Sequence, residues 1–278
     1  MQGGYGSFHE IAARKYFFNE KIGLVDCHTF EELFEAISKK EADCAVMAIE
    51  NSVAGSLLSN YALVKNSGMN ISGEVYLKIV QNLIALPGQC MKDIKVIYSH
   101  PMAILQCRKF LDPLREKGVE IVETIDTALS AKYIRDKKVR GAAALASEVA
   151  AGMYQLEVIA ESVESNSRNY TRFLVVEPAD AAEKNINSDK ASICFSLPHK
   201  VGSLSQVLSV LAYYGINLTK IQSLPIVGKE WEYFFYLDLL FEDYSMYKKA
   251  LSAISPLIDQ LQVLGEYISG KMPADMPE

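Results

Sequence analysis

The chain has 278 residues, of which 50% are hydrophobic, and its formal net charge is −6. This length exceeds one typical domain of about 100–200 residues, so two globular parts are expected, and the acidic charge argues against a nucleic-acid partner because such proteins present a basic face. The five cysteines are scattered without CxxC spacing, and there is neither a long apolar run nor a basic-then-apolar leader, which predicts a soluble, cytoplasmic protein with no structural zinc site and no membrane partner.

Residues 1–178 repeat one pattern, in which an apolar strand is followed by a short polar elbow and then a helix. The elbows are Glu50-Asn51-Ser52, Ser99-His100, Asp126-Thr127 and Ser147. Strands that alternate with helices predict an α/β fold with a largely parallel sheet. In such sheets ligands bind beyond the carboxyl ends of the strands, where helix amino termini favour anions. Four elbows together favour one anion-binding cleft, whereas each elbow alone is better explained as a helix cap.

A glycine-rich loop at residues 3–6 precedes the first predicted helix. Ser7 and Glu10 have the spacing of a capping box at the start of that helix. Glycines let a backbone approach a ligand closely. No Gly-Lys-Ser/Thr follows, so the loop is not a Walker phosphate loop, and taken by itself it is better explained as a plain helix cap.

The sequence pattern changes near residue 180. Residues 180–190 are polar and charged, which predicts a linker. Beyond them the order strand, helix, two strands, helix, strand predicts a ferredoxin-like βαββαβ module. The tail from Lys271 is expected to be disordered.

The order of motifs resembles that of the prephenate dehydratases. The matching motifs are Gly6-Ser7-Phe8, Glu50-Asn51-Ser52, YSHPMAILQC (98–107), DTALSA (126–131) and NYTRFLVV (169–176). The second module resembles an ACT domain, an amino-acid-sensing unit. The resemblance implies a two-lobed, periplasmic-binding-protein-like catalytic domain at 1–178, with the active site in the cleft between its α/β lobes, and an ACT regulatory domain at 190–268.

This family converts prephenate to phenylpyruvate, carbon dioxide and water on the route to phenylalanine. The resemblance therefore implies a lyase that uses no cofactor and no metal. It also implies a homodimer or homotetramer that binds L-phenylalanine at the ACT domains as an allosteric inhibitor. Relatives have a strand before the glycine loop, where only Met1 and Gln2 stand here, so either a truncated first strand or a start further upstream is expected.

The resemblance also implies the site residues. Thr171 matches the family's essential threonine. A threonine hydroxyl is a weak acid, so we expect it to hydrogen-bond the departing ring oxygen and relay a proton through water. The residues expected to contact the substrate are Ser7, Asn51, Ser52, Ser99, Gln106, Arg172 and Phe173. Helix amino termini at Ser7, Asn51 and Ser99 are expected to hold carboxylates.

Thr171 and Arg172 cannot both face one cleft if they lie in a regular strand, because successive side chains of a strand point to opposite faces. Either the pair precedes the strand or a bulge re-aims one side chain. Arg172 could then pair with a substrate carboxylate bidentately. If the strand is regular from Tyr170, Thr171 remains catalytic and Arg172 becomes a supporting or structural residue.

The regulatory module departs from its family pattern. The residues expected to bind phenylalanine are Gly202, Ser203, Leu204, Asn217, Leu218, Gln222 and Ser223. Val201 stands where a proline is common, and Gln222-Ser223-Leu224-Pro225 replaces a Glu-Ser-Arg-Pro motif, so two charges are lost. His9 likewise stands where relatives have Ser or Thr.

Two other functions fit the same residues. An arogenate dehydratase differs only in the amino group of its substrate, and the sequence does not separate it from a prephenate dehydratase. An amino-acid-binding regulator without turnover would share the fold, but the intact Thr171 argues against it.

Overall fold

The computed structural model describes residues 1–181 and 186–273, so parts of the expected linker (182–185) and of the expected disordered tail (274–278) lie outside the described residues. The chain divides into two compact units. The first joins Met1–Leu57 with Val75–Phe173, and the second joins Leu58–Glu74 with Leu174–Lys271. The expected boundaries, 1–178 and 190–268, run continuously along the chain and do not include this interleaving.

The first unit contains most of the α/β elements. They are α1 (Phe8–Tyr16), α2 (Phe30–Ser38), β1 (Ala45–Asn51), β2 (Gly55–Ser56), β4 (Asn82–Ala85), η1 (Met91–Asp93), β5 (Val96–Ser99), α4 (Pro101–Gln106), α5 (Arg108–Glu116), β6 (Glu120–Glu123), α6 (Thr127–Lys137), β7 (Ala142–Ala146), α7 (Glu148–Met153) and β8 (Glu157–Ala160). The chain passes between the units within β3 (Met69–Lys78) and β9 (Tyr170–Pro178). One sheet has the order β2-β1-β9-β3. We call residues 1–57 and 170–173 of the first unit the first lobe and residues 80–165 the second lobe.

The second lobe contains a five-stranded sheet of order β6-β5-β7-β4-β8. Strand β5 is parallel to β6 and β7, whereas β4 is antiparallel to β7 and β8. The expectation of a largely parallel sheet is therefore wrong for β4.

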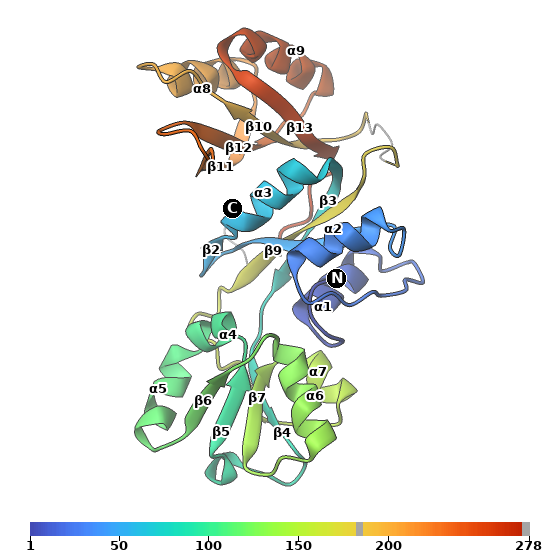
Figure 1. The fold of residues 1–278 in the computed structure, drawn as a ribbon, viewed down its shortest axis with the longest axis vertical. Coiled ribbons are helices and arrows are strands. Elements are labelled where there is room, and N and C mark those ends of the chain that lie inside the picture. Colours follow the sequence, from blue (N-terminus) through green and yellow to red (C-terminus); the bar gives the residue numbers. More distant parts are fainter. Residues whose placement is uncertain (182–185, 274–278) are drawn as a thin grey trace. The chain divides into compact units, whose positions relative to one another are not determined.

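Helices cover both faces of that sheet (Figure 1). Ala142, Ala144 and Ala146 of β7 pack with α6 and α7, while the alternate residues Ala143 and Leu145 pack with α4 and α5. Both faces of β7 are buried, which is why its sequence is continuously apolar. The carboxyl ends of β5, β6 and β7 lead into the elbows noted in the sequence.

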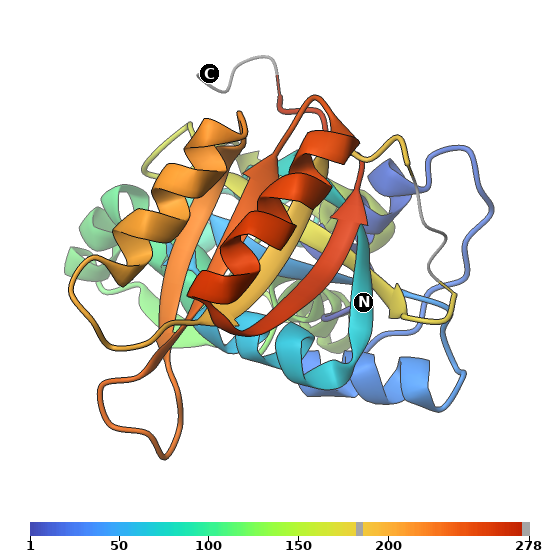
Figure 2. The ribbon, with the colours of Figure 1, turned by 90° about the horizontal axis from the view of Figure 1, so that it is seen from above.

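The second unit has the element order β10 (Lys190–Ser196), α8 (Ser203–Tyr213), β11 (Asn217–Pro225), β12 (Tyr233–Leu240), α9 (Tyr244–Ile254), η2 (Ser255–Leu257) and β13 (Asp259–Tyr267). Its strands form an antiparallel sheet of order β11-β12-β10-β13. Figure 2 shows α8 and α9 side by side over one face of this sheet. The inward residues Ala191, Ile193 and Phe195 of β10 join their shared core, as strand alternation requires.

The second unit also includes α3 (Leu58–Ser67) and the start of β3. The Tyr61 ring packs against the Tyr236 ring, with centroids 5.4 Å apart. Glu74 and Lys190 form an ion pair at 2.9 Å with both side chains almost fully buried. Aromatic packing and a buried ion pair thus attach this early segment to the C-terminal sheet. Among the helices of residues 1–181 and 186–273, none has the length and apolar character needed to cross a bilayer.

Candidate active site

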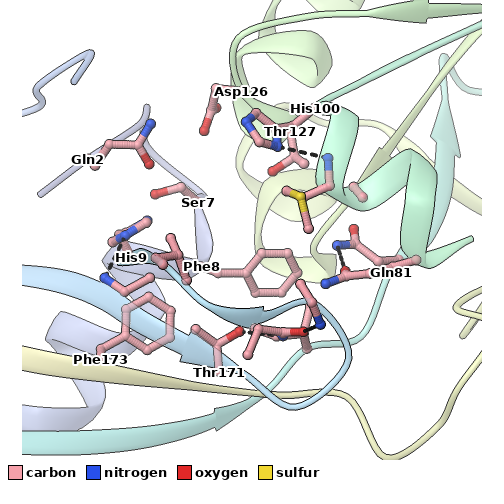
Figure 3. Close-up of a pocket in the computed structure, with 18 of the residues that line it drawn as sticks. Gln2, Ser7, Phe8, His9, Gln81, His100, Asp126, Thr127, Thr171 and Phe173 are labelled. Atoms are coloured by element: carbon pink, nitrogen blue, oxygen red, sulfur yellow. Dashed lines mark hydrogen bonds between the residues drawn. The ribbon is translucent and has the colours of Figure 1, made fainter. Parts of the chain in front are cut away.

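A cavity of about 350 Å³ lies in the first unit and is lined by residues of both lobes (Figure 3). This volume is within the range of small-molecule sites. The first lobe contributes Ser7, Asn51 and Thr171, and the second contributes Gln106 and Asp126. Side chains far apart in sequence therefore meet around one space large enough for a small organic acid.

Strand β9 is assigned from Tyr170 onward, and its residues alternate about the cavity. Thr171 and Phe173 line the cavity, whereas Arg172 between them does not, although it is 95% buried. This is the regular-strand case considered from the sequence. The expected contact of Arg172 with substrate is not supported, because a regular strand turns its side chain to the opposite face.

Asn51 holds Thr171 in a defined hydrogen-bonding state. The side-chain oxygen of Asn51 accepts bonds from the N–H groups of Val53 and Ala54 at 2.9 and 2.8 Å. Its amide nitrogen donates to Asn169 Oδ1 at 2.8 Å and to Thr171 Oγ1 at 2.9 Å. Since the threonine oxygen accepts from Asn51, its own hydrogen is left to point elsewhere, and the cavity is the adjacent space.

The expected helix at the Glu50-Asn51-Ser52 elbow is absent from the described chain. Strand β1 runs to Asn51, a turn and the short strand β2 follow, and α3 begins only at Leu58. Asn51 therefore does not hold a carboxylate at a helix terminus. Ser52 also lies outside the cavity lining, since its hydroxyl donates to the Arg168 carbonyl and accepts from the Tyr170 N–H.

Ser99 does not reach the cavity, where it was expected to contact the substrate. Its hydroxyl donates to the Leu145 carbonyl at 2.9 Å, across the sheet, and does not line the cavity. The neighbouring His100 is the residue that caps α4, and its Nδ1 accepts from the Met102 N–H at 3.2 Å. His100 lines the cavity, and burial lowers its pKa.

Ser7 lines the cavity and caps α1, and its Oγ accepts from the Glu10 N–H at 3.4 Å. The other half of the expected capping box is shifted by one residue, because Glu10 Oε2 accepts from the Gly6 N–H at 2.6 Å. Phe8 and His9 occupy the first two positions of α1 and also line the cavity. The N–H groups at these positions have no acceptor within a helix and can bind an anion.

The glycines of residues 3–6 permit close packing against the second lobe. A Cβ atom on Gly3 would lie 2.4 Å from Asp126 Oδ2, and one on Gly6 would lie 2.9 Å from the backbone of Ala150. Both glycines have positive φ, 87° and 85°. The Gly6 carbonyl also accepts from Ser147 Oγ at 2.7 Å. The loop thus joins the two lobes beside the cavity, a role that the sequence pattern alone did not identify.

Three ionisable side chains line the cavity: His9, His100 and Asp126. Burial lowers the pKa of His9 to about 3, so its ring is neutral near pH 7. The ring nitrogen Nε2 accepts from the Ala48 N–H at 3.2 Å, and Phe173 packs edge-on against it at 5.0 Å. Burial raises the pKa of Asp126, although backbone N–H groups oppose this shift. The lining, all of it in the described part of the chain, contains no Lys or Arg.

Gln106 lines the cavity as expected, and beside it is Gln81, which the sequence did not single out (Figure 3). The amide nitrogen of Gln81 donates to Gln106 Oε1 at 3.4 Å. Asn169 was also missed, although it stands two residues before Thr171 and an extended chain brings such residues to one face. No comparable local signal marks Gln81.

The residues expected to bind phenylalanine fall into two groups. Gly202, Ser203 and Leu204 line a second pocket along α8. Asn217, Leu218, Gln222 and Ser223 lie on the edge strand β11 and are absent from that lining. Gln222 uses its amide nitrogen on the Ser223 carbonyl at 3.0 Å. One pocket of this chain therefore does not unite the two groups.

Within residues 1–181 and 186–273 no cluster of three or more His, Cys, Asp or Glu side chains is placed to hold a metal ion.

Comparisons with known proteins agree with this architecture. The family profile described as prephenate dehydratase matches residues 1–181. The bifunctional chorismate mutase/prephenate dehydratase of Aquifex aeolicus is 33% identical over 90% of this chain and 68% of its own length. Arogenate dehydratase 2 of Petunia hybrida is 36% identical over 96% of this chain and 71% of its own length. The solved prephenate dehydratase of Arthrobacter aurescens, in complex with L-Phe, has a TM-score of 0.84 at 28% identity and covers 96% of this chain and 88% of its own. The chain belongs to the prephenate dehydratase family.

Proposed function

We propose that the chain converts prephenate to phenylpyruvate, carbon dioxide and water. The observation that carries this proposal is the hydrogen bond from Asn51 to Thr171, because it leaves the threonine hydroxyl as a donor at the cavity. The reaction expels a ring hydroxyl, and a donor aimed at the leaving oxygen stabilises the charge that develops there. Family membership supports the same assignment.

The reaction needs orientation more than strong acid catalysis. The bond between the ring and its carboxylate breaks, and its electron pair makes the ring aromatic while the C–O bond to the hydroxyl breaks. The oxygen leaves with that second electron pair and takes a proton from water, through the Thr171 hydroxyl, to become water. Aromatisation drives these steps, so the protein gains most by holding the ring in the reactive orientation.

The start of α1 is the proposed carboxylate site. Phe8 and His9 line the cavity at the positive end of this nine-residue helix. The start of α6 is less suitable, because Asp126 already caps it by accepting from the Leu129 N–H at 2.7 Å. Arg172 has no part in this proposal.

A second candidate substrate is arogenate, which carries an ammonium group where prephenate has a ketone. Asp126 favours it, since a carboxylate that borders a cavity without Lys or Arg suits a cation. The similarity to a protein named arogenate dehydratase supports this candidate as well. The ratio of kcat/KM for the two substrates decides between them.

We further propose that the second unit is a ferredoxin-like ACT domain through which L-phenylalanine inhibits the enzyme, in a homodimer or homotetramer. The βαββαβ order of β10–β13 and the similarity to a dehydratase solved with L-Phe support this. Isothermal titration with phenylalanine, alongside light scattering for the oligomeric state, tests it. No binding at millimolar phenylalanine would mean that the replacement of the two charges near Gln222 and Leu224 has removed the site.

The catalytic proposal is tested with the full chain and purified prephenate, by following phenylpyruvate formation. Thr171→Val removes the hydroxyl and keeps the branched shape, and we expect turnover to fall about 100- to 1,000-fold. Thr171→Ser, the matched control, keeps the hydroxyl and should retain much of the rate. Equal rates for Thr171→Val and the wild type would remove Thr171 from the mechanism.

A further inference from the structure

The Gln81 side chain is held at the cavity by a fixed backbone. Its N–H donates to Glu164 Oε2 at 3.0 Å, and its carbonyl accepts from the Val163 N–H at 2.8 Å. The side chain is only 2% exposed, and it lines the cavity (Figure 3). The preceding Ile79 N–H donates to the Asn169 carbonyl at 2.7 Å, so this segment runs beside the start of the strand that carries Thr171.

Only the nitrogen of the Gln81 side-chain amide has a hydrogen-bond partner among the described residues. Its nitrogen donates to Gln106 Oε1 at 3.4 Å, which is a long bond. Its oxygen is closed off from solvent and has no hydrogen-bond partner among the described residues. A buried carbonyl without a donor loses its hydration and gains nothing in return. A group in this state at the wall of a ligand cavity is suited to accept from the ligand, and the soft terminal torsion of glutamine lets the oxygen turn toward it.

The chemistry of the substrate limits what this oxygen can accept. The two carboxylates and the ketone of prephenate are acceptors, and its ring hydroxyl is its hydrogen-bond donor. We propose that the Gln81 side-chain oxygen accepts the hydrogen of the ring hydroxyl that leaves. This contact turns a lone pair of the leaving oxygen toward the Thr171 hydroxyl. Gln81 thus holds the hydrogen that the leaving oxygen already carries, and Thr171 donates the second proton that makes it water. The inference rests on the proposed function.

The substitution Gln81→Met tests the inference, since methionine has similar length and no acceptor of comparable strength. We expect kcat/KM for the dehydratase reaction to fall about 10- to 100-fold. Thermal stability should change little, because the loss of the long bond to Gln106 Oε1 is offset by the removal of an unsatisfied buried oxygen. The affinity for phenylpyruvate, which lacks the ring hydroxyl, should stay within about twofold of the wild-type value by the same reasoning.

The matched control is Gln89→Met. Gln89 is also a buried glutamine, but it lies outside the cavity lining and its Oε1 accepts from the Gly141 N–H at 2.6 Å. This variant should lose stability and keep its kcat/KM. The two glutamines would thus show opposite responses, one in activity and the other in folding.

The other outcomes contradict either the inference about Gln81 or the proposed function. Undiminished kcat/KM in Gln81→Met overturns the inference, and so does a parallel loss of phenylpyruvate affinity, which would show a deformed cavity. A larger loss with arogenate than with prephenate would assign the oxygen to an ammonium group and also overturn it. A wild-type protein that turns over neither substrate overturns the proposed function, and with it the inference.

Discussion

His9 should make the stability of the first unit sensitive to mild acid. Burial lowers the pKa of the His9 imidazole from 6.5 to about 3, and Nε2 must be unprotonated to accept from the Ala48 N–H. Protonation would place a charge between Phe30 and Phe173, whose rings lie 5.7 and 5.0 Å from the imidazole. The folded state therefore disfavours the imidazolium that the unfolded chain forms readily.

The direction and size of the stability change follow from the difference between the His9 pKa values of the folded and unfolded states. A depressed folded-state pKa contributes stability that is complete above pH 6.5 and is lost as the pH falls toward about 3. Each pH unit within this window corresponds to about 1.4 kcal/mol. Between pH 6.5 and pH 5 the loss is thus about 2 kcal/mol, an upper value because the ring borders the cavity. For a unit of this size the melting temperature should fall by about 4–8 °C.

The assay compares thermal unfolding of the wild type and His9→Gln at pH 7, 6 and 5. A glutamine oxygen can accept from the Ala48 N–H without titrating in this range, so the variant should lose less stability between pH 7 and pH 5. His28→Gln changes an exposed histidine of the same unit and should behave as the wild type does. The reasoning is refuted if the wild type and His9→Gln lose equal stability over this interval.

Three other substitutions test separate contacts. Asn51→Leu removes the donor to the Thr171 hydroxyl and should lower kcat about 10- to 100-fold in a steady-state assay, whereas a normal kcat would exclude this positioning role. Lys190→Met leaves Glu74 buried without its cation and should cost about 3–5 kcal/mol in urea unfolding, most of which Glu74→Met should restore in the double variant. Gly265→Ala would place a Cβ 2.1 Å from the Ile71 carbonyl oxygen, so it should lower the melting temperature, and an unchanged value would contradict that close packing.

Local signals in the sequence predicted local structure well. Ser7 and Ser147 cap helices α1 and α7 as their spacing indicated, and of the two candidates Asp126 and Thr127 the aspartate caps α6. A cap is decided by a side chain and an N–H group three residues away, so a short window contains the information. The alternation of Thr171 and Arg172 about the cavity follows from a strand's period in the same way.

The features that the sequence did not predict depend on contacts between residues far apart in the chain. Asn51 looked like the start of a helix, but its segment continues as a strand and then pairs back on itself through β2. Its amide meets Asn169, 118 residues away, and no window around Asn51 contains that partner. Gln81 belongs to the same class, because its orphaned oxygen follows from the cavity around it and not from its neighbours in the chain.

The assignment of Leu58–Glu74 to the second unit has a consequence for synthesis of the chain. The Glu74 carboxylate pairs with the ammonium of Lys190, which is 116 residues further along the sequence, and Ile71 packs against Gly265, which is further still. During synthesis on the ribosome, the segment Leu58–Glu74 therefore lacks its packing partners until nearly the whole chain has emerged. Until then Tyr61 and Ile71 are not covered. A fragment ending at residue 181, where the family match ends, would keep that apolar surface permanently exposed and should aggregate.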